Sequence, residues 1–149
     1  MTPSTFFSRL AAFIKTFQID GQIIFGDVKV VSAFKKSMVA RMRFPGCLII
    51  VGNYITDGEH PEIGVQRFQI NFAVQNKQDV YGENVWTGSG TTLGLHQIAE
   101  KLVEALTSTT ALADSVIIVE GSVGNTLVIN NNEGIHMRLF TCESLLDGY

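Results

Sequence analysis

A ten-residue segment near the middle of the chain alternates between apolar and polar side chains more regularly than any other. In residues 66–75 the apolar set alternates with a neutral set: Phe68, Ile70, Phe72 and Val74 against Gln69, Asn71, Ala73 and Gln75. Successive side chains of a strand point to opposite faces, so this period of two predicts a strand with one face in the core. The uncharged face is either ordinary solvated sheet or a surface that another protein covers at low desolvation cost.

Further strands are predicted on both sides of this segment. Residues 47–56 form a continuous apolar run of strand length, which favours a central strand covered on both faces. Residues 22–32 are a strand candidate with an interruption at Gly26. Three more are expected in the last third of the chain, at 115–120, 126–130 and 134–142.

Two helices are predicted from a period of three to four residues. Thr2 and Pro3 form a start signal for a helix over 3–17, and Thr92 is the expected cap of a helix over 93–108. Residues 33–44 are compatible with a short helix or an extended arm. We therefore expect one domain over residues 1–149, of α+β class, with a mainly antiparallel sheet and two helices packed on one face.

Charge is sparse and unevenly distributed. Of the 149 residues, 17% are charged and 46% are hydrophobic. This composition favours some apolar surface that partners cover. A well-filled core with polar loops would explain the same composition. The net charge is −3, yet residues 29–43 carry five cations and no acid, so the rest carries −8. This basic segment is either a solvated linker or a docking site for an acidic surface, of protein or nucleic acid, and we single out Lys35, Lys36, Arg41 and Arg43 as contacts.

The loop expected over 76–91 supplies two more candidate contacts, Tyr81 and Trp86. Loops of this length are uncommon in compact domains, and an aromatic side chain on such a loop is a frequent anchor at protein interfaces. The alternative for Trp86 is that it folds back over its own core.

No catalytic residue, cofactor or metal site is predicted, and we do not expect an enzyme. His60, His96 and His136 are isolated from one another, Glu59 and Glu62 lie in a polar loop, and the spacing of Gly88, Gly90 and Gly94 fits a hinge better than a phosphate loop. Cys47 and Cys142 each lie in an apolar run and are expected to be reduced and buried. The chain has no signal-peptide pattern and no apolar run of about 18 residues, so we expect folding in a cytoplasm and no membrane partner.

The order of these elements resembles a known family. The pattern begins with an N-terminal helix and continues with a buried strand preceded by Phe44-Pro45-Gly46. The next strand contains Arg67-Phe68-Gln69-Ile70-Asn71-Phe72, and a long loop follows it. A helix with Leu95, Ile98, Leu102 and Leu106, and a last strand ending Leu139-Phe140-Thr141-Cys142, complete the pattern. Over residues 22–143 the chain is similar to the small tail proteins of Mu-like phages and prophages and, more loosely, to phage tail terminators.

This resemblance implies a structural virion protein made in the bacterial cytoplasm. Tail terminators form a ring, usually a hexamer, that caps the head-proximal end of the tail tube, stops its polymerisation and meets the head-completion proteins. The implied partners are further copies of the chain, the tube protein and the head-completion or connector protein, with the sheath protein as a further candidate and DNA as cargo in the lumen. Alternatives are another connector or baseplate component, or a small-ligand-binding or enzyme-accessory domain.

Overall fold

The computed structural model describes most of the chain. It covers residues 1–56, 58–60, 62–76, 85–88, 93–109, 112, 116–122 and 134–147, with the backbone alone for 117–122. Tyr81 and the strand expected at 126–130 lie outside these ranges.

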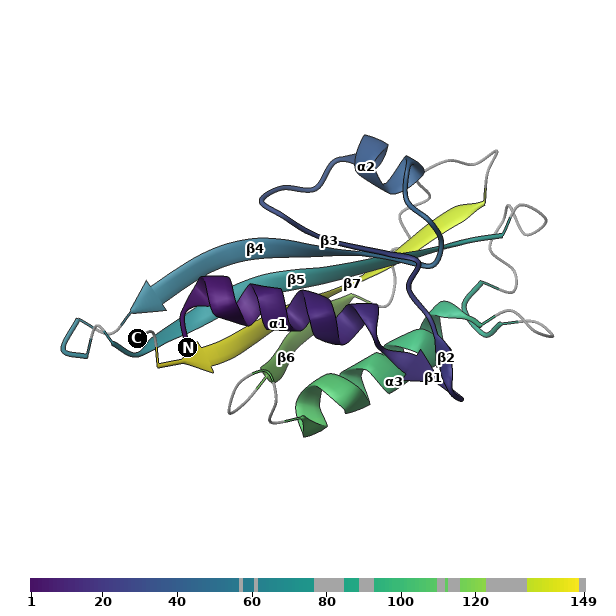
Figure 1. The fold of residues 1–149 in the computed structure, drawn as a ribbon. Coiled ribbons are helices and arrows are strands. Elements are labelled where there is room, and N and C mark those ends of the chain that lie inside the picture. The colour runs from purple at the N-terminus through teal and green to yellow at the C-terminus, as the bar shows by residue number, and fades with distance from the viewer. Residues whose placement is uncertain are drawn as a thin grey trace.

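Helices and strands follow one another in the order shown in Figure 1. Their bounds are α1 (Pro3–Lys15), β1 (Gln18–Ile19), β2 (Gln22–Ile23), β3 (Asp27–Val31), α2 (Lys36–Ala40), β4 (Gly46–Thr56), β5 (Gly64–Gln75), α3 (Leu95–Ser108), β6 (Val116–Ser122) and β7 (Ile135–Leu146). The short strands β1 and β2 pair only with each other, and the other five form one sheet in the order β3-β4-β5-β7-β6. β3 is parallel to β4 and all other neighbours in this sheet are antiparallel. The α+β class and the mainly antiparallel sheet are confirmed.

The alternating segment is the central strand of the sheet. β5 pairs with β4 on one side and with β7 on the other, and Phe68, Ile70, Phe72 and Val74 are all buried, as predicted. Residues paired across antiparallel strands point to the same face. Cys47 and Ile49 of β4 and Phe140 of β7 therefore extend this apolar face on both sides of β5.

Side chains of α1 and α3 belong to the same hydrophobic cluster as this face of the sheet. Phe6, Phe7, Leu10 and Ile14 come from α1, and Leu95, Ile98, Ala99, Leu102 and Leu106 come from α3. The Phe6 and Phe68 rings meet edge to face, with 5.3 Å between centroids. Thr2 caps α1 as expected, because its hydroxyl accepts a hydrogen bond from the amide of Thr5 at 3.2 Å. The helix ends at Lys15 instead of residue 17.

The opposite face of the sheet carries a second, smaller cluster under α2. This short helix forms within the segment for which helix and arm were both open, and its Val39, together with Met42, packs with Leu48, Ala73 and Met137. Figure 1 shows α2 well away from α1 and α3. The helices of the whole fold therefore contribute to two separate clusters.

The segment over 22–32 is interrupted around Gly26, as predicted, and its two parts, β2 and β3, belong to different sheets. Two local predictions are corrected. β4 is buried only in its first half: Gly46 to Ile49 are buried, whereas Val51, Gly52 and Asn53 are exposed. The ladder also shifts register between Val51 and Tyr54. The N-cap of α3 is Gly94, not Thr92.

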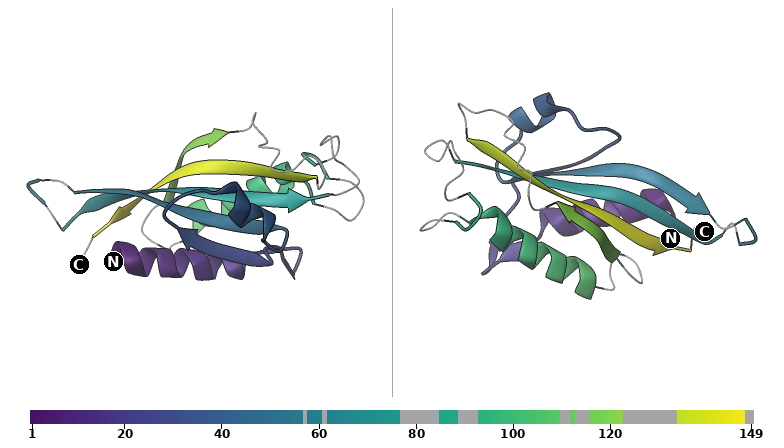
Figure 2. Two further views of the ribbon diagram at one scale, coloured as in Figure 1. Left: turned by 90° about the horizontal axis from the view of Figure 1, so that it is seen from above. Right: turned by 180° about the vertical axis from the view of Figure 1, so that it is seen from behind.

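The β4–β5 hairpin projects beyond the body of the molecule. In both views of Figure 2 it extends past the two chain ends, which lie close together. The amino group of Met1 bonds to the backbone oxygen and carboxylate of Asp147 there. The molecule therefore has a long axis along the strands, with the hairpin at one end.

Candidate interaction surfaces

The basic segment is an exposed, unneutralised patch. Lys29 lies on the edge strand β3, Lys35 and Arg41 cap the two ends of α2, Lys36 begins that helix and Arg43 leads towards β4; all five are exposed. Among the residues that the structure describes, none of the five has an ion-pair partner. Five like charges on about fifteen residues repel one another, so a binding partner with acidic groups would relieve that repulsion.

Packing of α2 explains why the cations point outward. The helix is too short to be stable alone and depends on its buried side chains. Val39 is fully buried, and Met42, just past the end of the helix, is nearly so. Anchoring through these apolar residues leaves Lys35, Lys36 and Arg41 to the solvent. Lys35, Lys36, Arg41 and Arg43, the four contacts predicted from the sequence, are thus exposed positions in and around α2.

Trp86 lies away from this patch and is half-buried. It packs against the main core, and its ring lies tilted against the His96 ring with 4.9 Å between centroids. Its carbonyl accepts a hydrogen bond from the His96 amide at 3.0 Å. Of the two predictions for this residue, the structure shows the one in which the ring folds back over the core. The other aromatic candidate, Tyr81, lies outside the described residues.

A pocket between α3 and β7, the Arg138 pocket, was missed by the sequence analysis. It has a volume of about 430 Å³ and is lined by His96, Ala99, Glu100, Val103, Arg138 and Phe140. Arg138 Nη1 donates to His96 Nδ1 at 3.3 Å, and the guanidinium carbon lies 4.9 Å from the centre of the Phe140 ring. Burial lowers the pKa of Arg138, and the attraction of Glu100 opposes this effect.

The sequence did contain a signal for this pocket. Arg138 lies two residues before Phe140 on β7, so both side chains are on the main-core face of the sheet. His136, two residues earlier, faces the same way; it is 2% exposed, and within the described structure neither ring nitrogen has a hydrogen-bond partner. Polar side chains at inward positions of an amphipathic strand mark a site that needs an explanation.

The neutral face of β5 is divided by α2. Asn71 and Ala73 are buried beneath the helix, whereas Gln69 and Gln75 stay half-exposed. Farther towards the hairpin, Ile55, Val65 and Leu145 pair side by side across three strands. Ile55 is 48% and Leu145 50% exposed. This outer row is the apolar surface that the sparse charge of the sequence led us to expect.

An exposed ion pair lies beside the outer row. Arg67 Nε bonds to Glu143 Oε1 at 3.0 Å across β5 and β7. Exposed pairs of this kind contribute little to stability, on the order of 0.2–1 kcal/mol. The charges beside the outer row of Ile55, Val65 and Leu145 therefore already neutralise each other. The free energy of any association through this row would come from contact between apolar side chains.

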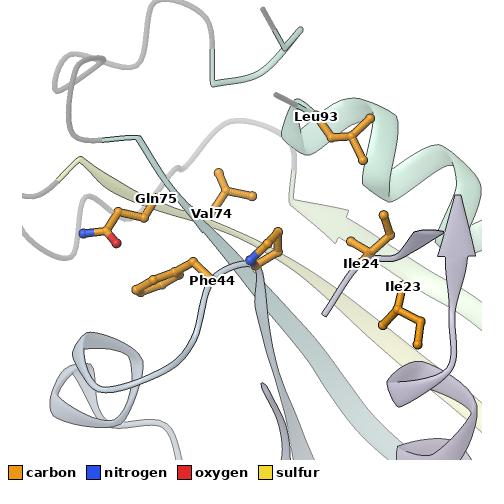
Figure 3. Close-up of a pocket in the computed structure, with 7 residues that line it drawn as sticks. Ile23, Ile24, Phe44, Val74, Gln75 and Leu93 are labelled. Carbon is orange, nitrogen blue, oxygen red and sulfur yellow. The ribbon is translucent and has the colours of Figure 1, made fainter. Parts of the chain in front are cut away.

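A second hollow lies near the β1–β2 hairpin and is shown in Figure 3. Its volume is about 260 Å³, and it is lined by Ile23, Ile24, Phe44, Pro45, Val74, Gln75 and Leu93. Gln75 is the one polar side chain in this lining and no lining residue is ionisable. Such a hollow can hold an apolar group but offers no acid or base for catalysis.

The remaining residues with reactive chemistry are dispersed. His60 and Glu62 are exposed and lie 3.4 Å apart in the hairpin tip, and Glu59 beside them is exposed too. Both cysteines are fully buried, as expected. In the described ranges no three His, Cys, Asp or Glu residues gather as a metal site would require. No helix there is long and apolar enough to cross a membrane.

Fold and surfaces together define an α+β domain whose notable features are surfaces: a basic patch, an outer apolar row and a cationic pocket. Neither any protein-family model nor any curated protein sequence matches the chain.

Proposed function

We propose that this protein is a structural subunit of a phage tail that assembles through the basic segment into a ring. The ring caps the head-proximal end of the tail tube, ends its polymerisation and forms the junction to the head-completion proteins. The resemblance of residues 22–143 to small tail proteins and tail terminators supports the tail assignment. The observation that carries the assembly role is the cluster of five exposed cations without ion pairs in the described structure.

Charge segregation favours a head-to-tail contact between copies. The patch around α2 is basic, while the chain outside it carries −8. A contact between two different surfaces of identical subunits propagates, and it closes into a ring when the rotation per subunit allows it. Complementary charge guides such an encounter and fixes its orientation. An acidic exterior also suits a lumen that DNA passes without sticking.

The test reverses charge in the basic segment and in a matched region. The variant K35E/K36E should remain folded and lose assembly. The control R9E/K15E changes the net charge equally on exposed positions of α1 and should assemble as the unchanged chain does. Native mass spectrometry and negative-stain images, taken over a range of concentrations, report the oligomer. An unchanged chain that stays monomeric throughout, or a K35E/K36E variant that still forms rings, contradicts the proposal.

A role in a different class is favoured by one observation. The apolar hollow of Figure 3 has room for a small apolar group, as in a ligand-binding or enzyme-accessory domain. A monomer that binds a small apolar molecule there would support that role. Another connector or baseplate protein would instead form oligomers but leave tail length unaffected, so tail length in the presence of each variant separates it from a terminator.

A further inference from the structure

The cation in the Arg138 pocket is incompletely neutralised. Its Nε is buried with no hydrogen-bond partner, and one terminal nitrogen bonds to a ring nitrogen of His96. Glu100 lines the same pocket, yet no carboxylate of the described chain forms an ion pair with Arg138. A partly buried guanidinium without an anion is unfavourable, and a carboxylate from outside would satisfy it with charge-assisted hydrogen bonds.

The shape of the pocket restricts what enters it. The Phe140 ring lies against the face of the guanidinium, Nε is buried and Nη1 is bonded to His96. The terminal nitrogen Nη2 is therefore the group left to donate to an incoming carboxylate. Ala99, Val103 and Phe140 form apolar walls around this group. The matching group is thus an acidic side chain with an apolar neighbour.

The hairpin tip, residues 58–60, 62 and 63, has this combination. Glu59 and Glu62 are exposed, and Ile63 directly after them is 40% exposed. Glu62 lies 3.4 Å from the His60 ring, an exposed contact that a buried charge-assisted bond to Arg138 would replace. This tip cannot fill the pocket of its own chain. β5 begins at Gly64, beside the tip, and Phe72 of the same strand pairs with Arg138. Gly64 and Phe72 are eight residues apart, so the distance between them along the strand is roughly 26 Å at 3.3 Å per residue. Figure 1 shows the tip and the start of α3 at opposite ends of the molecule.

We infer that the Arg138 pocket is the socket for the hairpin tip of a neighbouring copy, with Glu59 or Glu62 bonded to Arg138 and Ile63 against the apolar walls. This inference rests on the proposed assembly and names a contact within it. Tip and socket are different surfaces at opposite ends, so each copy offers one of each and the contact is head-to-tail. The basic segment then steers or reinforces an interface that the socket fixes in register.

Mixing two variants tests the contact directly. R138Q loses the socket and keeps the tip, whereas E59Q/E62Q loses the tip and keeps the socket. Each variant alone should be monomeric at concentrations where the unchanged chain is assembled. An equimolar mixture should give a one-to-one heterodimer and nothing larger, because only one working contact remains. Native mass spectrometry distinguishes the two chains by mass, and circular dichroism checks that R138Q is folded.

A surface variant gives a second test that leaves the buried cation in place. Glu100 is exposed at the pocket and repels an incoming carboxylate, so E100K should tighten assembly by roughly threefold to tenfold. E104K, one turn later on α3 and outside the pocket, is the matched control and should change it little. If R138Q assembles normally, or E100K has no more effect than E104K, the socket is wrong while the proposed assembly stands. An unchanged chain that never assembles overturns the proposed function itself.

Discussion

Arg138 and His136 occupy positions of β7 whose partners on β5 are Phe72 and Val74. A buried polar group without a hydrogen bond costs about 1–3 kcal/mol, so two such side chains on one strand lower the stability of the fold. An apolar residue at either position would avoid this cost. Arg138 is accounted for if it serves a contact outside its own chain, as inferred above.

The two cysteines allow a prediction at the residue scale. Burial raises the pKa of the Cys142 thiol to about 12, and burial together with the nearby Cys142 raises that of Cys47. The folded chain therefore holds both thiol protons at a pH where the unfolded chain releases them. The contribution of the protonated thiols to the free energy of unfolding is fully present below pH 9. It is lost as pH rises from about 9 towards 12, and the free energy of unfolding then falls by up to about 1.4 kcal/mol per thiol per pH unit.

Urea unfolding at a series of pH values measures this slope. The variant C47A/C142A serves as the reference, because the titration of lysine and tyrosine affects it and the unchanged chain alike. The free energy of unfolding of this variant should fall less steeply with pH than that of the unchanged chain. In the same range the native thiols should resist alkylation until urea is added. Equal slopes for the two chains would show that the thiols are not protected.

At the scale of elements, the start of α3 depends on a close backbone approach. The amides of Leu95 and His96 donate to the carbonyls of Val85 and Trp86 at 2.8 and 3.0 Å. These bonds pair two of the N–H groups that the first turn of a helix leaves without an intrahelical partner. A Cβ on Gly94 would lie 2.3 Å from the backbone nitrogen of Gly88 and 2.4 Å from the Trp86 oxygen.

The substitution G94A should therefore separate this segment from the helix. We expect a loss of roughly 1–3 kcal/mol in the free energy of unfolding, typical of overpacking against backbone that cannot yield. G58A is the control, because a Cβ there meets nothing within 4 Å. Thermal unfolding followed by circular dichroism compares the two. A melting temperature for G94A equal to that of G58A would mean that residues 85–88 do not hold the start of α3.

Local patterns predicted the longer helices and strands (α1, α3, β4, β5 and β7), but not how they meet. The strand over 66–75 and the helix beginning at Pro3 were predicted correctly because their signals, alternation and a cap, lie within the segment itself. The interruption at Gly26 was expected from the sequence. That β2 and β3 join different sheets depends on which strands they pair with, which is a tertiary property. The Arg138 pocket joins His96 to a residue 42 positions away, and no short-range pattern reports such a contact.

At the scale of the whole molecule, two kinds of surface compete to drive association. The basic segment and the Arg138 pocket offer charge, while Ile55, Val65 and Leu145 offer an apolar row. The charged surfaces carry the proposed contacts, and the row lies beside the base of the hairpin. The response of association to salt distinguishes the charged surfaces from the apolar row. Screening by salt weakens contacts between exposed charges, whereas it leaves contacts between apolar side chains unchanged or stronger.

We expect salt to weaken assembly. Raising sodium chloride from about 0.05 M to about 0.5 M shortens the screening length from roughly 14 Å to roughly 4 Å, so the dissociation constant should rise at least tenfold. Sedimentation velocity at several concentrations measures it, and the melting temperature of the K35E/K36E variant in the same buffers shows whether salt affects the fold. Tighter assembly at high salt would contradict this expectation. It would mean that charges oppose association and that the apolar row provides the main contact, because salt would then be screening repulsion between like subunits.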